Sequence, residues 1–142
     1  MSEINILVAT PGDAQELAQL NALFNGSSDS AEMLVARMAN PQNIETVILA
    51  SLEGNVAGFA ALRVVPCVLY PTPHAELTEL YVKEEYRQYG IGTRLVRFLE
   101  KLAVEKGAES LIVQTDADNQ PALSLYHALG FVDYDIVLKK PL

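Results

Sequence analysis

Hydrophobic residues recur every three to four positions in one long segment near the middle of the chain. They are Ile91, Leu95, Phe98, Leu99 and Leu102. This is the spacing of one face of an α-helix, and the charged residues of the same segment fall on other faces. The pattern therefore predicts an amphipathic helix, which is opened by the turn Arg87–Thr93.

Shorter hydrophobic runs that are bounded by turn residues predict the strands. The predicted strands are Ile4–Ala9, Glu45–Leu52, Val56–Val65, His74–Val82, Glu109–Thr115 and, as a last strand or hairpin, Phe131–Leu138. Glu53-Gly54-Asn55 is typical of the turn of an antiparallel hairpin. Helical spacing predicts further helices around Leu17–Phe24, Met33–Met38 and Ala122–Leu129. This order predicts an α/β fold (an α+β mixed sheet) in a single domain of residues 1–142.

In one predicted strand, His74–Val82, the alternation of hydrophobic and polar positions is broken. Leu77 has odd parity, whereas Leu80 and Val82 have even parity, so a regular pleat cannot bury all three on one face. A slip of one residue at Thr78-Glu79 restores the common face, which predicts a β-bulge there. The alternative is a strand that is buried on both faces and needs no slip.

The composition predicts a folded protein in the cytoplasm. Half of the 142 residues are hydrophobic (50%), which argues against disorder. No hydrophobic run approaches the roughly 18 residues that a membrane span needs. The N-terminus also lacks the basic start and the long hydrophobic core of a signal peptide. We therefore expect no membrane partner.

Charge and the few residues with special chemistry narrow the classes of partner. Eighteen acidic residues against ten basic ones give a formal net charge of -8, which disfavours binding to nucleic acid and favours a cationic substrate. The one cysteine, Cys67, has hydrophobic neighbours and is interpreted as a small packed side chain rather than a nucleophile. His74, His127 and Cys67 have no ligand spacing, so no metal site is expected.

The turn before the central helix has the chemistry of a phosphate site. Gly90 and Gly92 lack a Cβ atom, so an anion can approach the backbone amides closely. A helix N-terminus adds unpaired N–H groups and a partial positive charge. The alternative interpretation is an ordinary helix cap that contains two incidental glycines. A P-loop is disfavoured because the chain has no Gly-Lys-Ser/Thr sequence, and a dinucleotide fold is disfavoured because Leu95 occupies the position of the third glycine.

Two segments together resemble the GNAT superfamily of N-acetyltransferases. The first is Leu80–Val82 followed by Arg87-x-x-Gly90-x-Gly92. The second is Asn119-x-x-Ala122-x-x-Leu125-Tyr126-x-x-x-Gly130-Phe131, and one helix and one strand separate the two. The matching segments cover roughly the second half of the chain.

The resemblance implies a GNAT fold that binds acetyl-CoA in a V-shaped split between the parallel strands that end at Val82 and Thr115. The pantetheine arm would pair with the first of these strands, and the pyrophosphate would lie on the amides of the turn. The implied cofactor-binding residues are Leu80, Tyr81, Val82, Arg87, Gln88, Tyr89, Gly90, Ile91, Gly92, Thr93, Asn119, Ala122 and Tyr126. The family also carries a bulge beside the thioester, where a free amide near Leu80 can bind the oxyanion. A homodimer is implied as well.

The implied reaction is direct attack of a primary amine on the acetyl thioester in a ternary complex. Tyr126 is the candidate acid at the leaving thiolate, and its alternative is an aromatic residue that only packs. Glu79 and Glu76 are the candidate bases; either can act through water, can merely attract the amine, or can be a surface carboxylate. Arg87 contacts phosphate, fixes the turn, or is a solvated charge. Asn119 binds the pantetheine arm or caps its helix.

The acceptor amine belongs either to a small molecule, polyamine-like or aminoglycoside-like, or to a protein. Its site would be formed by the loops 25–30 and 66–74 and by the end of the last hairpin. An acetyl-CoA-dependent N-acetyltransferase is therefore the main functional prediction. The alternative is a non-catalytic acyl-CoA-binding module that regulates a partner.

Overall fold

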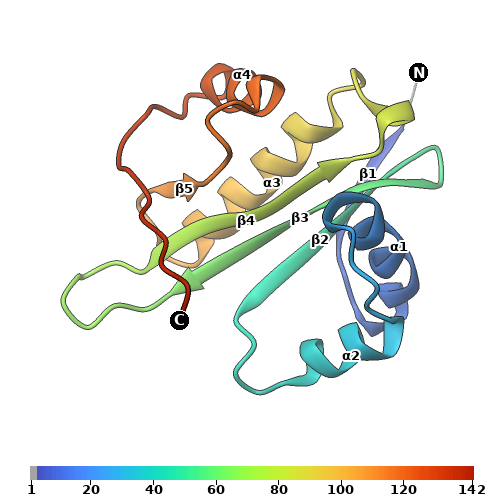
Figure 1. Cartoon of the computed structure of the whole chain (residues 1–142), viewed down its shortest axis with the longest axis horizontal. Coiled ribbons are helices and arrows are strands. Elements are labelled where there is room, and N and C mark those ends of the chain that lie inside the picture. The colour runs from blue at the N-terminus through green and yellow to red at the C-terminus, as the bar shows by residue number, and fades with distance from the viewer. Residues whose placement is uncertain (1–2) are drawn as a thin grey trace. The chain divides into compact units, whose positions relative to one another are not determined.

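The computed structural model describes residues 3–142 and divides the chain into two compact units, Met1–Ile112 and Val113–Leu142. The first unit contains most of the elements (Figure 1). These are β1 (Ile4–Val8), a 3-10 turn (Pro11–Asp13), α1 (Ala14–Asn25), α2 (Ala31–Ala39), β2 (Glu45–Leu52), β3 (Asn55–Val65), β4 (His74–Val82), a second 3-10 turn (Glu84–Tyr86) and α3 (Ile91–Glu105). β5 (Leu111–Val113) lies at the boundary, and α4 (Gln120–Ala128) belongs to the second unit.

The strands form one mixed sheet in the order β1-β2-β3-β4-β5. The first four strands pair with their sequence neighbours in antiparallel fashion. The hairpin between β2 and β3 is closed by Glu53 and Gly54, whose φ angles of 50° and 84° suit a tight turn. The predicted mixed sheet is confirmed, and β5 is shorter than the strand Glu109–Thr115 that the sequence predicts.

The predicted β-bulge lies where the broken alternation places it. Ala61 of β3 pairs with Glu79 of β4, whereas the next residue, Leu62, pairs with Leu77. Thr78 is therefore the extra residue, without an opposite residue in β3. The slip returns Leu80 to the face on which Leu77 is buried, which is the physical reason for the bulge.

Helices α1 and α2 cover one face of the sheet (Figure 1). Leu17 and Leu20 of α1 form a buried cluster with Leu49 and Phe59 of the sheet, and Tyr81 of β4 packs against it. A second set of helix residues, Leu34 and Met38 of α2, also packs there. Because neighbouring strand residues point to opposite faces, Phe59 and Tyr81 identify this face as the one that also carries Glu79.

Helix α3 packs on the opposite face, mainly against β3 and β4. Ile91, Leu95 and Leu99 are at most 1% exposed, so the predicted hydrophobic stripe is confirmed as the buried side of the helix. Each such side chain contributes about 1.5–3 kcal/mol when it leaves water. The buried stripe thus holds the first turn of α3 at a fixed position relative to β4.

The second unit is organised around α4. Asn119 caps the helix, because its side-chain oxygen accepts a hydrogen bond from the N–H of Ala122 (3.3 Å). The helix ends before Gly130, whose φ of 99° is left-handed. The rings of Tyr126 and Phe131 meet edge to face, with 5.5 Å between their centroids.

The prediction of a last strand or hairpin at Phe131–Leu138 is wrong. Residues 131–142 have no regular structure, and the alternating side chains Val132, Tyr134, Ile136 and Leu138 are 77–87% exposed. Alternation shows that a segment is able to form a half-buried strand, but a strand also needs a neighbour with which to pair.

Within the described residues, no helix is long and apolar enough to cross a membrane.

Candidate acyl-CoA and acceptor site

The turn before α3 has an unusual backbone that only a few residue types tolerate. Gly90 is the N-cap of α3 and has a φ of 83°, while Gln88 has a φ of 69°. A Cβ atom at Gly90 would have open space around it, so glycine is required there for its φ angle and not for room. Among the described residues of the first turn of α3, none is acidic. Its amides are therefore suited to bind an anion.

Arg87 ties this turn to the end of β4. Its Nε donates a hydrogen bond to the backbone oxygen of Val82 (2.9 Å). Its guanidinium carbon lies 5.8 Å from the centroid of the Tyr81 ring, a cation–π distance. This geometry supports the interpretation that Arg87 fixes the turn, and the remaining guanidinium N–H groups keep their capacity to donate to phosphate.

Tyr81 in turn connects the turn to α1. Its ring stacks on Phe24, with 5.1 Å between centroids and 28° between planes. Phe59 completes the group, at 6.0 Å from Phe24 and 6.3 Å from Tyr81. Residues from α1, β3, β4 and the turn are thus joined in one continuous contact.

Glu79 is a partly buried carboxylate whose pKa is shifted by its surroundings. Its Oε1 accepts a hydrogen bond from Nδ2 of Asn25, the last residue of α1 (3.4 Å), and the same Nδ2 donates to Asn21 (2.8 Å). Burial raises the pKa of Glu79, the hydrogen bond from Asn25 lowers it, and the charge of Glu45 raises it further. The net result is a raised pKa, as expected of a candidate base.

Glu76, the other candidate base, precedes the bulge in β4, whereas Glu79 follows it. It is half-buried and pairs in register with Arg63 of β3. Because Arg63 and Ala61, which lie opposite Glu76 and Glu79, share one face of β3, the bulge leaves both candidate carboxylates on the same face of the sheet.

Two residues of this region were missed by the sequence analysis. Glu45 of β2 accepts a hydrogen bond from the hydroxyl of Thr78 (2.7 Å) and lies 3.8 Å from Nη2 of Arg63. Asn25 was assigned only to a loop that contacts the acceptor. No short sequence pattern indicates the Thr78–Glu45 or the Asn25–Glu79 hydrogen bond, because the partners are 33 and 54 residues apart. The polar character of Glu45 at the start of a largely buried strand is the one available hint.

The loop 25–30, predicted to select substrate, is held by its own hydrogen bonds. Asp29 forms an ion pair with Arg37 of α2 (2.6 Å), which lowers the pKa of Asp29. Ser30 caps α2 by accepting from the N–H of Met33 (3.3 Å). The loop is therefore braced against α2.

The remaining predicted site residues, Asn119, Ala122 and Tyr126, lie in the second unit. Tyr126 is buried (7% exposed), and burial raises its pKa to about 12. The cap formed by Asn119 confirms the capping interpretation and uses only its side-chain oxygen, so its NH2 group can still donate. The predicted residues thus form two groups, one in each unit.

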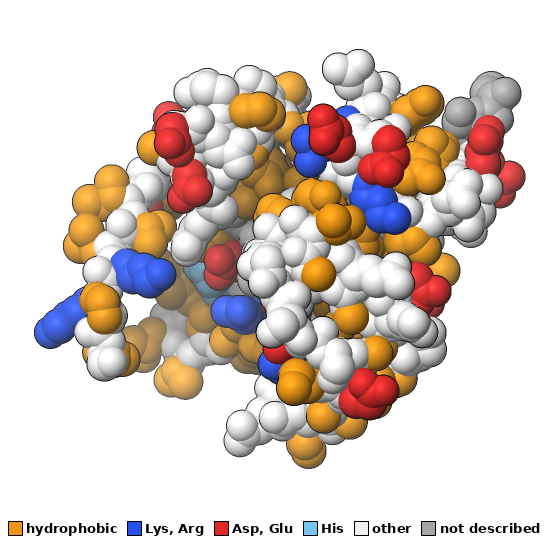
Figure 2. Space-filling model, turned by 45° about the vertical axis from the view of Figure 1, so that its right-hand side comes forward, with side chains coloured by type: hydrophobic (Ala, Val, Ile, Leu, Met, Phe, Trp, Pro, Cys, Tyr) orange, Lys and Arg blue, Asp and Glu red, His pale blue; other side chains and the backbone are white. Residues whose placement is uncertain are grey.

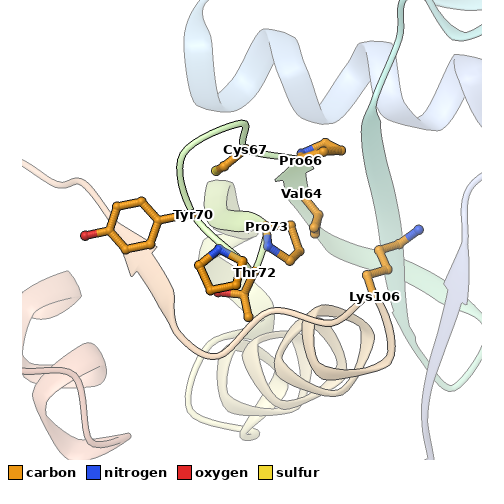
Figure 3. A pocket seen from close by; sticks show the side chains of 8 residues that line it. Val64, Pro66, Cys67, Tyr70, Thr72, Pro73 and Lys106 are labelled. Atoms are coloured by element: carbon orange, nitrogen blue, oxygen red, sulfur yellow. The ribbon is translucent and has the colours of Figure 1, made fainter.

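An open pocket of about 430 Å³ lies under the loop 66–73 (Figure 3). It is lined by Val64, Pro66, Cys67, Tyr70, Pro71, Thr72, Pro73 and Lys106. Lys106 follows the last residue of α3, whereas the phosphate-type turn precedes the first, so the two sites are separated by the length of the helix. The pocket combines a thiol, a phenol and an amine with prolines, and it contains no carboxylate.

The face of the molecule drawn in Figure 2 has no single large acidic region. Acidic, basic and hydrophobic side chains are intermixed there (Figure 2). Within residues 3–142, no group of three or more His, Cys, Asp or Glu side chains is placed to hold a metal ion. The surroundings of Glu79 therefore say more about the site than the net charge of the chain does.

Comparison with known proteins decides the family. The profile of the acetyltransferase (GNAT) family matches residues 14–131, which is most of the chain. The chain belongs to the GNAT acetyltransferase family. This confirms the resemblance seen in its two motifs and extends it to the first helices.

Individual relatives of this GNAT protein differ in length and substrate. It is 31% identical to mycothiol acetyltransferase from Arthrobacter sp. (strain FB24) over 93% of its own length, but it spans only 43% of that protein. It is 25% identical to an aminoglycoside acetyltransferase from an uncultured soil metagenomic sample, solved with trehalose (TM-score 0.83; 98% and 95% of the two chains). The aminoglycoside N-acetyltransferase AAC(6')-Iy, solved with CoA, shares its fold (TM-score 0.85, 20% identity, 100% and 96% covered).

Proposed function

We propose that this GNAT protein transfers an acetyl group from acetyl-CoA to a primary amine of a cationic small molecule. The observation that carries the proposal is the partly buried Glu79 carboxylate beside the bulge of β4, with its raised pKa. The same strand leads through the 3-10 turn Glu84–Tyr86 into the glycine turn of α3. Binding and proton transfer would thus be served by one continuous segment of chain.

The residues of the turn fit the anionic part of acetyl-CoA. The donor set consists of backbone amides at a helix N-terminus, opened by the left-handed Gly90 and without an acidic side chain in the first turn. Leu80 to Val82 would pair with the pantetheine arm, and Gln88 to Thr93 would hold the pyrophosphate. Acetyl-CoA supplies the activated acetyl thioester.

Glu79 would remove the proton that keeps the acceptor amine unreactive. An alkylammonium has a pKa of about 10.4 and has no free electron pair while protonated. A carboxylate with a raised pKa is a better base near neutral pH and is also an attractive partner for the cation. The first proton passes from the ammonium through Glu79 to solvent. The nitrogen then forms its bond to the acetyl carbon, the carbon–sulfur bond breaks, and the nitrogen loses a second proton to solvent as the amide forms, which balances the proton that the leaving thiolate takes up. Glu76 is the second candidate for this role.

Two further groups would stabilise the charges that develop. A backbone N–H near Leu80 would donate to the acetyl oxygen, at the position that the bulge opens. The hydroxyl of Tyr126 would donate to the leaving thiolate. Because the pKa of Tyr126 is about 12 and that of a thiol is about 8.5, a hydrogen bond is favoured over complete proton transfer, and the thiolate takes its proton from solvent.

The acceptor class is supported by charge and by the relatives. The net charge of -8 and the carboxylates of Glu45, Glu76 and Glu79 on one region of the sheet favour a cationic molecule. Relatives with this fold include aminoglycoside acetyltransferases. We therefore rank polyamine-like and aminoglycoside-like amines above a protein amino group.

The test is release of free thiol from acetyl-CoA in the presence of single amines. The panel contains a polyamine, an aminoglycoside and a peptide with a free N-terminus. We expect saturable release with at least one cationic small molecule. Tight CoA binding without thiol release from any amine would contradict the proposal and favour a non-catalytic acyl-CoA-binding module.

A further inference from the structure

Glu45 holds the bulge of β4 from a strand that is not its neighbour. In register, Glu45 of β2 lies opposite Arg63 of β3, and Arg63 lies opposite Glu76 of β4. The Glu45 side chain nevertheless reaches past β3, because its Oε2 accepts the hydrogen bond of the Thr78 hydroxyl (2.7 Å). Thr78 is the residue without an opposite partner in β3, so this contact restrains the irregular point of the strand.

We propose that Glu45 is a positioning residue for acetyl transfer, which fixes the bulge through Thr78 and sets the electrostatic environment of Glu79. The proposal rests on the proposed function, in which Glu79 is the base. It assigns Glu45 no contact with substrate. Its role is to act through Thr78 and Glu79.

The groups around Glu79 come from four elements. Asn25 at the end of α1 donates a hydrogen bond to it, Glu45 of β2 and Glu76 of β4 are acidic, and Arg63 of β3 is basic. Arg63 lies 3.8 Å from the carboxylate of Glu45, with both side chains partly exposed, so it offsets only part of that charge. In keeping with this geometry, the charge of Glu45 raises the pKa of Glu79. Burial of the carboxylate is the larger cause of the raised pKa. A base whose pKa lies closer to the operating pH is the more effective one.

The two parts of this role are separable by substitution. Glu45→Gln keeps a side-chain oxygen that can accept from Thr78 but removes the negative charge. Thr78→Val keeps the branched shape but removes the hydroxyl donor, while the charge of Glu45 remains. Glu53→Gln, in the turn at the other end of β2, is a matched control that removes one carboxylate far from the bulge.

The first measurement is titration of the Glu79 carboxyl carbon by NMR in the full-length protein without ligand. We expect Glu45→Gln to lower the Glu79 titration midpoint, and Glu53→Gln to leave it in place. Thr78→Val is expected to keep the midpoint above that of Glu45→Gln. An unchanged midpoint in Glu45→Gln would overturn the electrostatic part of the proposal.

The second measurement is the pH profile of turnover with the best acceptor. Glu45→Gln should move the acidic limb of kcat/KM to lower pH. Thr78→Val should lower kcat about fivefold, the value of one net hydrogen bond, with the KM for acetyl-CoA unchanged. An unaltered kcat in Thr78→Val would overturn the positioning part. If the wild-type protein turns over no amine, the proposed function fails, while the NMR titration still decides the role of Glu45.

Discussion

Glu79 is a carboxylate that the fold partly removes from water and at the same time supplies with one hydrogen bond. Burial raises its pKa above the ordinary 4.5, and Asn25 reverses part of that effect. The folded state therefore binds the Glu79 proton more tightly than the unfolded state does. The stabilisation from this proton is complete below the unfolded pKa and is lost as the pH rises through the raised folded pKa.

The pH dependence of stability follows from this sign. Glu79→Gln is neutral at every pH, so we expect it to be more stable than the wild type at neutral pH. The difference should shrink as the pH falls through the raised folded pKa of Glu79, and it should be lost below the unfolded value of 4.5. Chemical denaturation at neutral and acidic pH measures both values. Glu32→Gln, a carboxylate on the first turn of α2, is the control. A stability difference that stays constant with pH would refute the perturbed state of Glu79.

Tyr126 is a second residue whose chemistry is set by burial. With a pKa of about 12 it is neutral at physiological pH, so its hydroxyl is present as a donor. We expect Tyr126→Phe to lower kcat by about 10²-fold, because a positioned donor is lost, while the edge-to-face contact with Phe131 and the affinity for CoA are kept. Tyr134→Phe is the matched control, since Tyr134 is 86% exposed. Unchanged kcat in Tyr126→Phe would leave this tyrosine a packing role.

At the scale of elements, the candidate site is formed by β4 with its bulge, the turn and α3. The strand is fixed by pairing with β3, the helix is fixed by its buried stripe, and Arg87 links the end of one to the start of the other. The turn is held at both ends, and its left-handed conformation carries a conformational cost at Gln88 but not at Gly90, because glycine lacks a Cβ atom. The amides that we propose to bind the pyrophosphate therefore belong to a turn that is held in place at both ends.

The demand for glycine at position 90 is testable with a pair of alanine variants. Gly90→Ala forces a Cβ into a left-handed conformation, so we expect the free energy of unfolding to fall by about 1–2 kcal/mol and CoA binding to weaken. Gly12→Ala is the control, because its Cβ meets only the Thr10 hydroxyl oxygen at an ordinary 3.6 Å and its φ is not left-handed. Calorimetry of CoA binding and denaturation of both variants provide the comparison. Equal behaviour of the two variants would contradict the role assigned to Gly90.

At the scale of the whole molecule, what the sequence predicted depends on how local the cause is. The limits of β2 and β4 follow from patterns contained within each strand, and so does the bulge, because the break in parity occurs between Leu77 and Leu80. The motif pair that indicates the family is also a matter of short spacings. These predictions needed no knowledge of which distant residues come into contact in the fold.

Features that depend on a partner far along the chain were not predictable. The Thr78–Glu45 and Asn25–Glu79 hydrogen bonds join residues on separate elements. Residues 131–138 show the reverse case, a strand pattern without a strand, since no local property states whether a neighbouring edge is available. Sequence patterns thus predicted most of the elements and the position of the glycine turn, and the structure was needed for the environment of the candidate base.

The hydrogen bond that crosses β3 makes the side chains at positions 45 and 78 depend on each other. A hydrophobic residue at 78 leaves the Glu45 carboxylate without its donor, and a hydrophobic residue at 45 leaves the half-buried hydroxyl without its acceptor. Either change alone carries a cost that the double replacement avoids. Among relatives that retain the bulge, we therefore expect these two positions to vary together, although they are neither adjacent in sequence nor on neighbouring strands.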